Sequence, residues 1–218
     1  GPDLVVPAAV QELTSVASFG RRGSCDVSPT HVLCTETELR FVIHGQVATL
    51  HASGRHFLDN ALAAWCVARA LGIDDRTIAS RLQRACVPSH RCELVQISNL
   101  TFIDDTASRC DFSLKAALQL LDSMNARRHV VVCGTEGAFA GALGTLGQRI
   151  VDFAGADVII AVADERDEIA RGAIDAGMPR GHCHRCASSA SAEEISTFLR
   201  PGDVVLFTGV DAQLPQRG

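Results

Sequence analysis

One stretch in the first third of the chain has the hydrophobic pattern of a β-hairpin. Residues 39–50 read LRFVIHGQVATL, two runs rich in apolar and β-branched residues on either side of His44 and Gly45. A polar residue followed by glycine between two such runs is typical of a tight turn. We therefore expect two antiparallel strands here.

Two runs with helical spacing follow the expected hairpin. Between residues 58 and 70 apolar side chains recur every three or four positions, and Gly72 stands where a helix commonly ends in the left-handed conformation. A second amphipathic run begins after a pair of aspartates and stops before Pro88. The segment 88–91 is the clearest break in the pattern, so we expect a domain boundary near residue 90.

The remainder of the chain alternates between strand-like and helix-like runs. Three runs, VVVC, VIIAV and VVLF, are continuously apolar, as in strands covered on both faces. Strand, helix and strand in series predict an α/β fold with a mostly parallel, doubly wound sheet, and the first two strands predict an antiparallel hairpin at its edge. The expected strands are 94–97, 100–103, 129–133, 157–162 and 204–208, and the expected helices lie near 112–124, 143–154, 165–177 and 191–199.

Composition and charge narrow the classes of function. With 47% hydrophobic and 21% charged residues, the 218-residue chain is typical of a globular protein of one or two domains. No run approaches the roughly 18 apolar residues of a membrane span, and a formal net charge of −5 argues against a nucleic-acid partner. Nine irregularly spaced cysteines are typical of buried thiols in the cytoplasm. The initial Gly-Pro is typical of what a protease leaves behind, so we expect a piece of a longer polypeptide.

A glycine-rich stretch after the strand at 129–133 lacks the spacing of a phosphate-binding loop. Gly134, Gly137, Gly141 and Gly144 fit neither the dinucleotide fingerprint nor the P-loop. The only lysine of the chain stands in an expected helix, outside any glycine frame. We favour an ordinary strand-to-helix loop over a phosphate site.

The cluster GHCHRC at residues 181–186 offers two histidines and two cysteines. A structural zinc site needs four converging ligands, and no second pair with matching spacing occurs in the sequence. A short strand and loop is the favoured interpretation, and zinc binding is the alternative.

Adjacent carboxylates, Asp104 and Asp105, follow the expected strand 100–103. Ligands of parallel α/β sheets bind beyond the carboxyl ends of the strands. Neighbouring residues of an extended chain point to opposite sides, so we expect at most one of the two to face a ligand. Arg91 and His56, each taken singly, favour surface or core roles over functional ones.

Four segments occur in an order that matches a known family. They are GRHFLDNALAAWCVARALGI at 54–73, HRCELVQISNLTFIDD at 90–105, SLKAALQLL at 113–121 and PGDVVLFTG at 201–209. Together they resemble the C-terminal half of the Mur ligases, and most closely the MurF type, which uses ATP to add D-alanyl-D-alanine to UDP-MurNAc-tripeptide through an acyl phosphate. The resemblance implies that residues 1–90 are the tail of the central ATPase domain and residues 91–218 the Rossmann-like C-terminal domain.

The same resemblance implies ligands and site residues. His56 and Asn60 would lie near the nucleotide, with Asn60 at the adenine, while Arg91 would reach the phosphates and Asp105 the ribose hydroxyls. The complete enzyme would use ATP and Mg²⁺, and its substrates would be UDP-MurNAc-peptide and D-alanyl-D-alanine. The family's P-loop and carbamoylated lysine do not occur in this sequence, so we expect the chain by itself to be inactive, and we assign it no catalytic residue and no metal ligand.

Several positions depart from the family pattern. Phe57 replaces an asparagine, and residues 107–111 replace the YNANP motif. The loop that would face the substrate is therefore degenerate, with Ser108, Arg109 and Ser113 as its polar candidates. Two functions stay open: a divergent ligase of the MurF type, or a ligase-like module that binds or scaffolds without catalysis.

Overall fold

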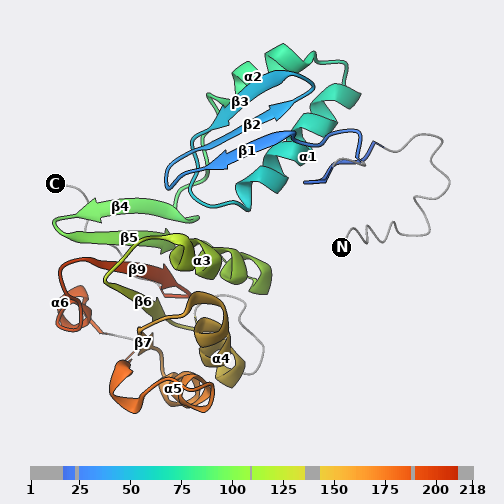
Figure 1. Ribbon diagram of the computed structural model, residues 1–218. Coiled ribbons are helices and arrows are strands. Elements are labelled where there is room, and N and C mark those ends of the chain that lie inside the picture. The colour runs from blue at the N-terminus through green and yellow to red at the C-terminus, as the bar shows by residue number, and fades with distance from the viewer. Residues whose placement is uncertain (1–16, 23–24, 109, 136–142, 188–189, 211–218) are drawn as a thin grey trace, which may run out of the picture. The chain divides into compact units, whose positions relative to one another are not determined.

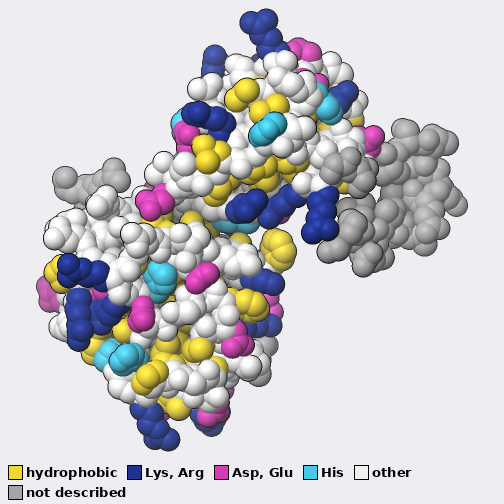
Figure 2. Space-filling view, in the orientation of Figure 1, with side chains coloured by type: hydrophobic (Ala, Val, Ile, Leu, Met, Phe, Trp, Pro, Cys, Tyr) yellow, Lys and Arg dark blue, Asp and Glu magenta, His cyan; other side chains and the backbone are white. Residues whose placement is uncertain are grey.

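The chain forms two compact units, residues 1–86 and 87–218 (Figure 1). The computed structural model describes residues 17–22, 25–108, 110–135, 143–187 and 190–210. Among these, no helix has the length and apolar character that crossing a membrane requires. Each unit has its own buried core, and charged side chains are spread over the visible surface of both units (Figure 2).

The first unit combines a three-stranded antiparallel sheet, in the order β1-β2-β3, with two helices. The predicted hairpin is confirmed as β2 and β3, and both predicted helices are found. Strand β1 was not predicted, because it is short and mostly exposed and so lacks a regular apolar alternation. The elements are β1 His31–Cys34, β2 Leu39–Ile43, β3 Gln46–Leu50, α1 Phe57–Ala70 and α2 Asp75–Leu82.

Local sequence explains the turns of this unit. His44 and Gly45 both have positive φ, 48° and 79°, as the tight turn between two twisted strands requires. Helix α1 ends at Ala70, and Gly72, just beyond it, has the positive φ of 80° that lets the amide of Ile73 donate to the carbonyl of Ala68 and close the last turn.

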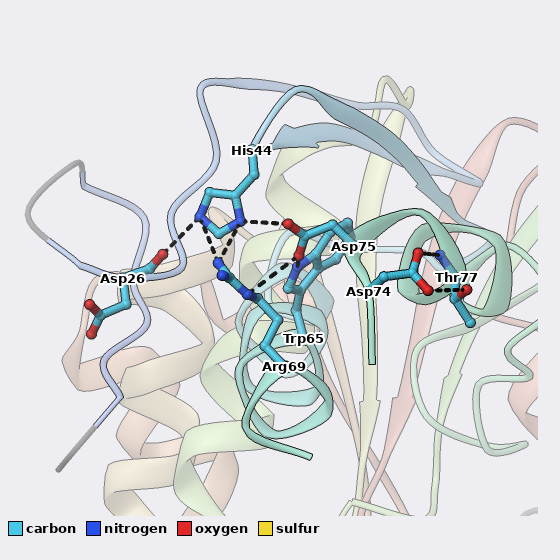
Figure 3. Close-up of polar contacts among 7 residues, drawn as sticks. All are labelled: Asp26, His44, Trp65, Arg69, Asp74, Asp75 and Thr77. Atoms are coloured by element: carbon cyan, nitrogen blue, oxygen red, sulfur yellow. Dashed lines mark hydrogen bonds and ion pairs between the residues drawn. The ribbon is translucent and has the colours of Figure 1, made fainter. Parts of the chain in front are cut away.

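A polar cluster fixes the hairpin turn against the junction of α1 and α2 (Figure 3). Asp75 accepts a 2.7 Å hydrogen bond from the buried Trp65 indole and lies 3.2 Å from Nδ1 of His44. Nε2 of His44 donates to the backbone carbonyl of Asp26 at 2.9 Å, and Arg69 lies against the same ring. Every ring nitrogen of His44 is therefore used, and the cluster is a structural brace.

The second unit contains a six-stranded sheet in the order β4-β5-β9-β6-β7-β8. The β4–β5 pair is antiparallel and all other pairs are parallel, which confirms the α/β fold with a mostly parallel sheet and an antiparallel edge. The strands are β4 Glu93–Ile97, β5 Leu100–Asp105, β6 Arg128–Cys133, β7 Val158–Val162, β8 Cys183–Cys186 and β9 Asp203–Thr208. The helices are α3 Asp111–Ser123, α4 Leu143–Ala154, α5 Arg166–Asp175 and α6 Ala192–Ser196.

Helices cover both faces of this sheet (Figure 1). Helix α6 places Ile195 in a core with Phe102 and Phe207, while α3, α4 and α5 lie over the face that carries Ile103 and Leu206. Burial on both faces is why the central strands are continuously apolar in sequence.

Two details of the second unit differ from the sequence expectations, and one expectation concerns residues outside the described ranges. Asp104 and Asp105 are the last two residues of β5 rather than residues beyond it, because parallel pairing with β9 continues to Thr208. Helix α6 is shorter than expected. Of the GHCHRC segment, residues Cys183–Cys186 form the short strand β8, while Gly181 and His182 lie in a 3-10 turn before it, as the favoured short strand and loop predicted. Most of the glycine-rich stretch, residues 136–142, lies outside the described residues.

Candidate functional site

Asp105 occupies the carboxyl end of β5, where the sheet leaves a polar group in its interior. Its Oδ1 accepts hydrogen bonds from the Ser108 hydroxyl at 2.7 Å, from the Cys92 amide at 3.1 Å and from the Cys92 thiol at 3.4 Å. Its Oδ2 is also buried but has no hydrogen-bond partner among the described residues. A buried carboxylate with hydrogen bonds to only one of its oxygens can accept a further hydrogen bond from a ligand at the other oxygen.

Burial also shifts the acidity of this group. It raises the pKa of Asp105 to about 6, against the hydrogen bonds from Ser108 and Cys92 and the charge of Arg91, which act in the opposite direction. Perturbed carboxyl groups of this kind are concentrated at functional sites.

Thr208 provides a second buried polar atom beside Asp105. The two residues are register partners on the parallel strands β5 and β9, so their side chains lie on the same face of the sheet. The Thr208 hydroxyl is fully buried and, like Oδ2 of Asp105, has no partner among the described residues. Two unsatisfied oxygens on adjacent strand ends form one polar position at the carboxyl edge, where α/β sheets bind ligands.

Asp104 points to the other face and has different partners. Its Oδ1 accepts from the amide and hydroxyl of Thr106, and its Oδ2 lies 2.7 Å from Nδ1 of His90. The hydrogen bond with Asp104 raises the pKa of His90. The two aspartates lie on opposite faces because successive strand residues alternate between faces, and that at most one of them faces a ligand stays a prediction.

Arg91 lies in the turn that leads into β4, next to this position. The residues on either side, His90 and Cys92, have positive φ of 61° and 51°, so the backbone reverses around Arg91. The Arg91 side chain is exposed, forms no ion pair within the described residues, and is close enough for its charge to oppose the rise in the Asp105 pKa. An exposed guanidinium near this polar position is suited to binding an anionic group.

The three polar candidates of the substrate-side loop, Ser108, Arg109 and Ser113, do not lie together on one described surface. Ser108 is buried and bonded to Asp105 rather than exposed on a loop surface. Ser113 lies in the first turn of α3, and its hydroxyl donates to the carbonyl of Cys110 at 2.7 Å, in a capping box with that residue. Arg109 lies outside the described residues.

His56 and Asn60 belong to the first unit, at the start of α1. The His56 ring packs on that of Phe57 with centroids 4.2 Å apart, and burial lowers the pKa of His56. Asn60 is exposed on the helix. Arg21 forms an ion pair at 2.6 Å with Asp59 in the first turn of α1.

The residues that sequence reasoning did not assign are Thr208 and Cys92. Neither has a local signal, since a threonine at the end of an apolar strand and a cysteine among polar residues are both unremarkable in sequence. Only the pairing register and the turn before β4 bring them to Asp105.

Comparison with known proteins gives these features a family context. Among curated proteins, the chain is 26% identical over 168 residues to the UDP-N-acetylmuramoylalanine--D-glutamate ligase of Streptococcus equi subsp. zooepidemicus, a match that covers 76% of this chain and 35% of that protein. It is 31% identical over 173 residues to the UDP-N-acetylmuramate--L-alanine ligase of Gloeothece citriformis, a match that covers 72% of this chain and 34% of that protein. The chain thus spans about a third of the length of these relatives.

Solved structures share the fold. Crystal structure II of MurF from Acinetobacter baumannii matches with a TM-score of 0.71 and 25% identity, and the match covers 89% of this chain and 44% of that one. The structure of MurF ligase from Thermotoga maritima in complex with ADP matches with a TM-score of 0.60 and 18% identity over 88% of this chain and 44% of that one, which supports the fold alone.

A model of one family spans the second unit almost entirely. The match runs from residue 90 to residue 210, more than half of the chain, and includes the whole sheet with Asp105 and Thr208 at its carboxyl edge. This chain belongs to the Mur ligase family, through its glutamate ligase domain.

Proposed function

We propose that the chain is the C-terminal part of an ATP-dependent ligase of the MurF type, which joins D-alanyl-D-alanine to UDP-MurNAc-tripeptide. In this proposal residues 1–90 are the end of the central domain and residues 91–218 the C-terminal domain. The 25% identity to MurF of Acinetobacter baumannii supports the type, while two curated relatives are named as D-glutamate and L-alanine ligases. The amine is therefore the part of the proposal that an experiment must decide.

The observation that carries the nucleotide part is the buried Oδ2 of Asp105, which has no hydrogen-bond partner in the part of the chain that the structure describes. A carboxylate that keeps one oxygen without a donor fits a ligand with hydroxyl donors, and the two hydroxyls of a ribose are such donors. Arg91, exposed and without an ion pair in the described part of the chain, would bind the phosphates, and His56 and Asn60 would lie on the adenine side. Ser108 then acts as a positioning residue, because its hydroxyl fixes the other oxygen of Asp105.

ATP would serve as the phosphoryl donor to a peptide carboxylate, and Mg²⁺ would offset charge on the phosphates. We assign neither a P-loop nor a ligand of that Mg²⁺ to this sequence. All nine cysteines are free thiols, in keeping with the reducing cytoplasm in which we place the protein.

The test is ADP release by the natural polypeptide that contains this chain, measured with ATP and Mg²⁺. Three substrate pairs are compared: UDP-MurNAc-tripeptide with D-alanyl-D-alanine, UDP-MurNAc-L-alanine with D-glutamate, and UDP-MurNAc with L-alanine. We expect release only with the first pair. Release with another pair would keep the ligase and overturn the MurF type.

Replacing Asp105 tests the site itself. We expect Asp105→Ala to raise the KM for ATP more than tenfold, which corresponds to roughly 1.4 kcal/mol of lost binding. Asp122→Asn, an exposed aspartate on α3, is the matched control and should leave the KM unchanged. An unchanged KM in Asp105→Ala would remove Asp105 from the nucleotide site.

A second function, a ligase-like module that binds without catalysis, is favoured by one specific observation. Residues 107–111 lack the family's substrate-facing motif, and within them Cys110 serves to cap α3 while Asp111 pairs with Arg149 at 2.7 Å. Folded protein that binds ATP but releases no ADP with any substrate pair would support this alternative.

A further inference from the structure

Three metal-binding side chains converge at the start of the β4–β5 edge hairpin. Glu93 and Asp104 are direct partners in the antiparallel register, and His90 lies in the turn just before Glu93. One ligand atom from each residue, an imidazole nitrogen and two carboxylate oxygens, lies within 4.8 Å of the other two. Among the described residues, this is where three such groups come together.

The charges at this position are unbalanced. Two carboxylates directly opposite each other on paired strands repel, and the Asp104 side chain is only 5% exposed. Its sole ion-pair partner in the described residues is His90, whose side chain is 61% exposed, and Glu93 has no ion pair there. A bound cation would neutralise both carboxylates, which a single imidazolium cannot do.

The surrounding bonds hold the ligands in orientation. The amide and hydroxyl of Thr106 both donate to Oδ1 of Asp104, which leaves Oδ2 directed at His90. The backbone of His90 is bonded on both sides, since its amide donates to Glu93 at 3.1 Å and its carbonyl accepts from Ala107 at 2.9 Å. Outer bonds of this kind orient the ligands of metal sites.

We propose that His90, Glu93 and Asp104 bind a divalent transition-metal ion, of the Zn²⁺ or Mn²⁺ class. The imidazole nitrogen favours such ions over Mg²⁺ and Ca²⁺, which prefer oxygen ligands alone. The metal replaces the proton shared by Nδ1 of His90 and Oδ2 of Asp104, and the exposed side of His90 leaves coordination positions for water. Because Asp104 and Asp105 lie on opposite faces of β5, the site is separate from the proposed nucleotide position and does not depend on it.

The test is titration of the full chain, freed of metal with a chelator, with Zn²⁺ by calorimetry and with Co²⁺ by visible absorption. We expect one equivalent to bind, and His90→Ala and Glu93→Gln each to weaken that binding more than tenfold. The cobalt spectrum should show nitrogen and oxygen ligands without a thiolate charge-transfer band. His182→Ala is the matched control, because it alters the competing Cys/His segment around β8 and should leave the affinity unchanged.

The opposing outcomes are distinct. No binding up to millimolar metal, or equal affinity in Glu93→Gln and the original chain, would show that the cluster is only a hydrogen-bonded brace of the hairpin. A thiolate band, or loss of binding in His182→Ala, would place the metal on the cysteines instead. Glu93 is exposed on an edge strand, so Glu93→Gln should remain folded, and circular dichroism of each variant verifies this.

Discussion

Asp105 is a single residue whose surroundings oppose its charge. Oδ2 is buried and meets no donor among the residues that the structure describes, and burial is the largest cause of the raised pKa of Asp105. A charged group in this position lowers the stability of the fold. Proteins keep such groups where binding requires them, which is the reason we propose a ligand beside Asp105.

This cost predicts a pH-dependent effect of Asp105→Asn. The folded pKa of about 6 exceeds the ordinary value of 3.8, so the protonated form favours the folded state. The stabilisation is present below about pH 4 and is lost as the pH rises through about 6. At about pH 7.5 we expect Asp105→Asn to raise the free energy of unfolding by about 2 kcal/mol and the Tm by several degrees, with little change at about pH 4. Thermal unfolding of Asp105→Asn and of the original chain, at about pH 4 and about pH 7.5, measures this difference in stability. Equal destabilisation at the two pH values would mean that Oδ2 already has a hydrogen-bond donor.

The neighbouring hydroxyl of Thr208 gives a second prediction at this scale. Thr208→Val keeps the shape of the side chain and removes a buried oxygen that has no partner in the described residues, so stability should not fall. If the hydroxyl contacts the ligand beside Asp105, affinity for ATP should fall roughly threefold to tenfold, the value of one hydrogen bond. Equilibrium binding of ATP to the natural polypeptide measures this. Thr101→Val, at the other end of β5, is the control and should not change affinity.

At the scale of elements, α4 and α5 pack through glycines. A Cβ on Gly172 would overlap the carbonyl of Gly144, and a Cβ on Gly147 would overlap the carbonyl of Ile169. The two helices therefore approach each other through their backbones, which no larger residue permits. Sequence periodicity predicted both helices but could not reveal this contact.

We expect Gly172→Ala to destabilise the protein by about 1–3 kcal/mol, because the added methyl group forces the helices apart. Gly144→Ala is a matched control from the same contact, since a Cβ there meets nothing within 4 Å, and it should be neutral or stabilising because alanine favours helices. Urea unfolding of both variants measures the difference. Equal stability of the two would contradict the close approach.

At the level of the whole molecule, the two units have separate cores, so two different signals can follow unfolding. Trp65 is the only tryptophan and is fully buried in the first unit, while the glycine contact of α4 and α5 lies in the second. We expect Gly172→Ala to shift the urea midpoint of far-ultraviolet circular dichroism more than that of Trp65 fluorescence. Identical shifts in both signals would show that the units unfold as one.

Local sequence patterns were sufficient to predict the class of fold and most of its helices and strands. Strands β6, β7 and β9 could be predicted because burial of both faces makes their sequences continuously apolar. Helices α1 and α3 could be predicted because each buries one face, which gives its apolar side chains a helical spacing. Ordered motifs also pointed to the Mur ligases, a family that the match over residues 90–210 confirms. The edge strand β1 was not predicted, because an exposed strand needs no hydrophobic pattern.

Which polar residues meet depends on the tertiary structure. The register of β5 against β9 places Thr208 beside Asp105, and the turn at His90 brings Cys92 to Asp105 and His90 to Asp104. The two aspartates are adjacent in sequence yet serve opposite faces, and the burial that distinguishes them comes from strands and helices distant along the chain. Pairing and burial depend on such distant segments, so local sequence cannot specify them.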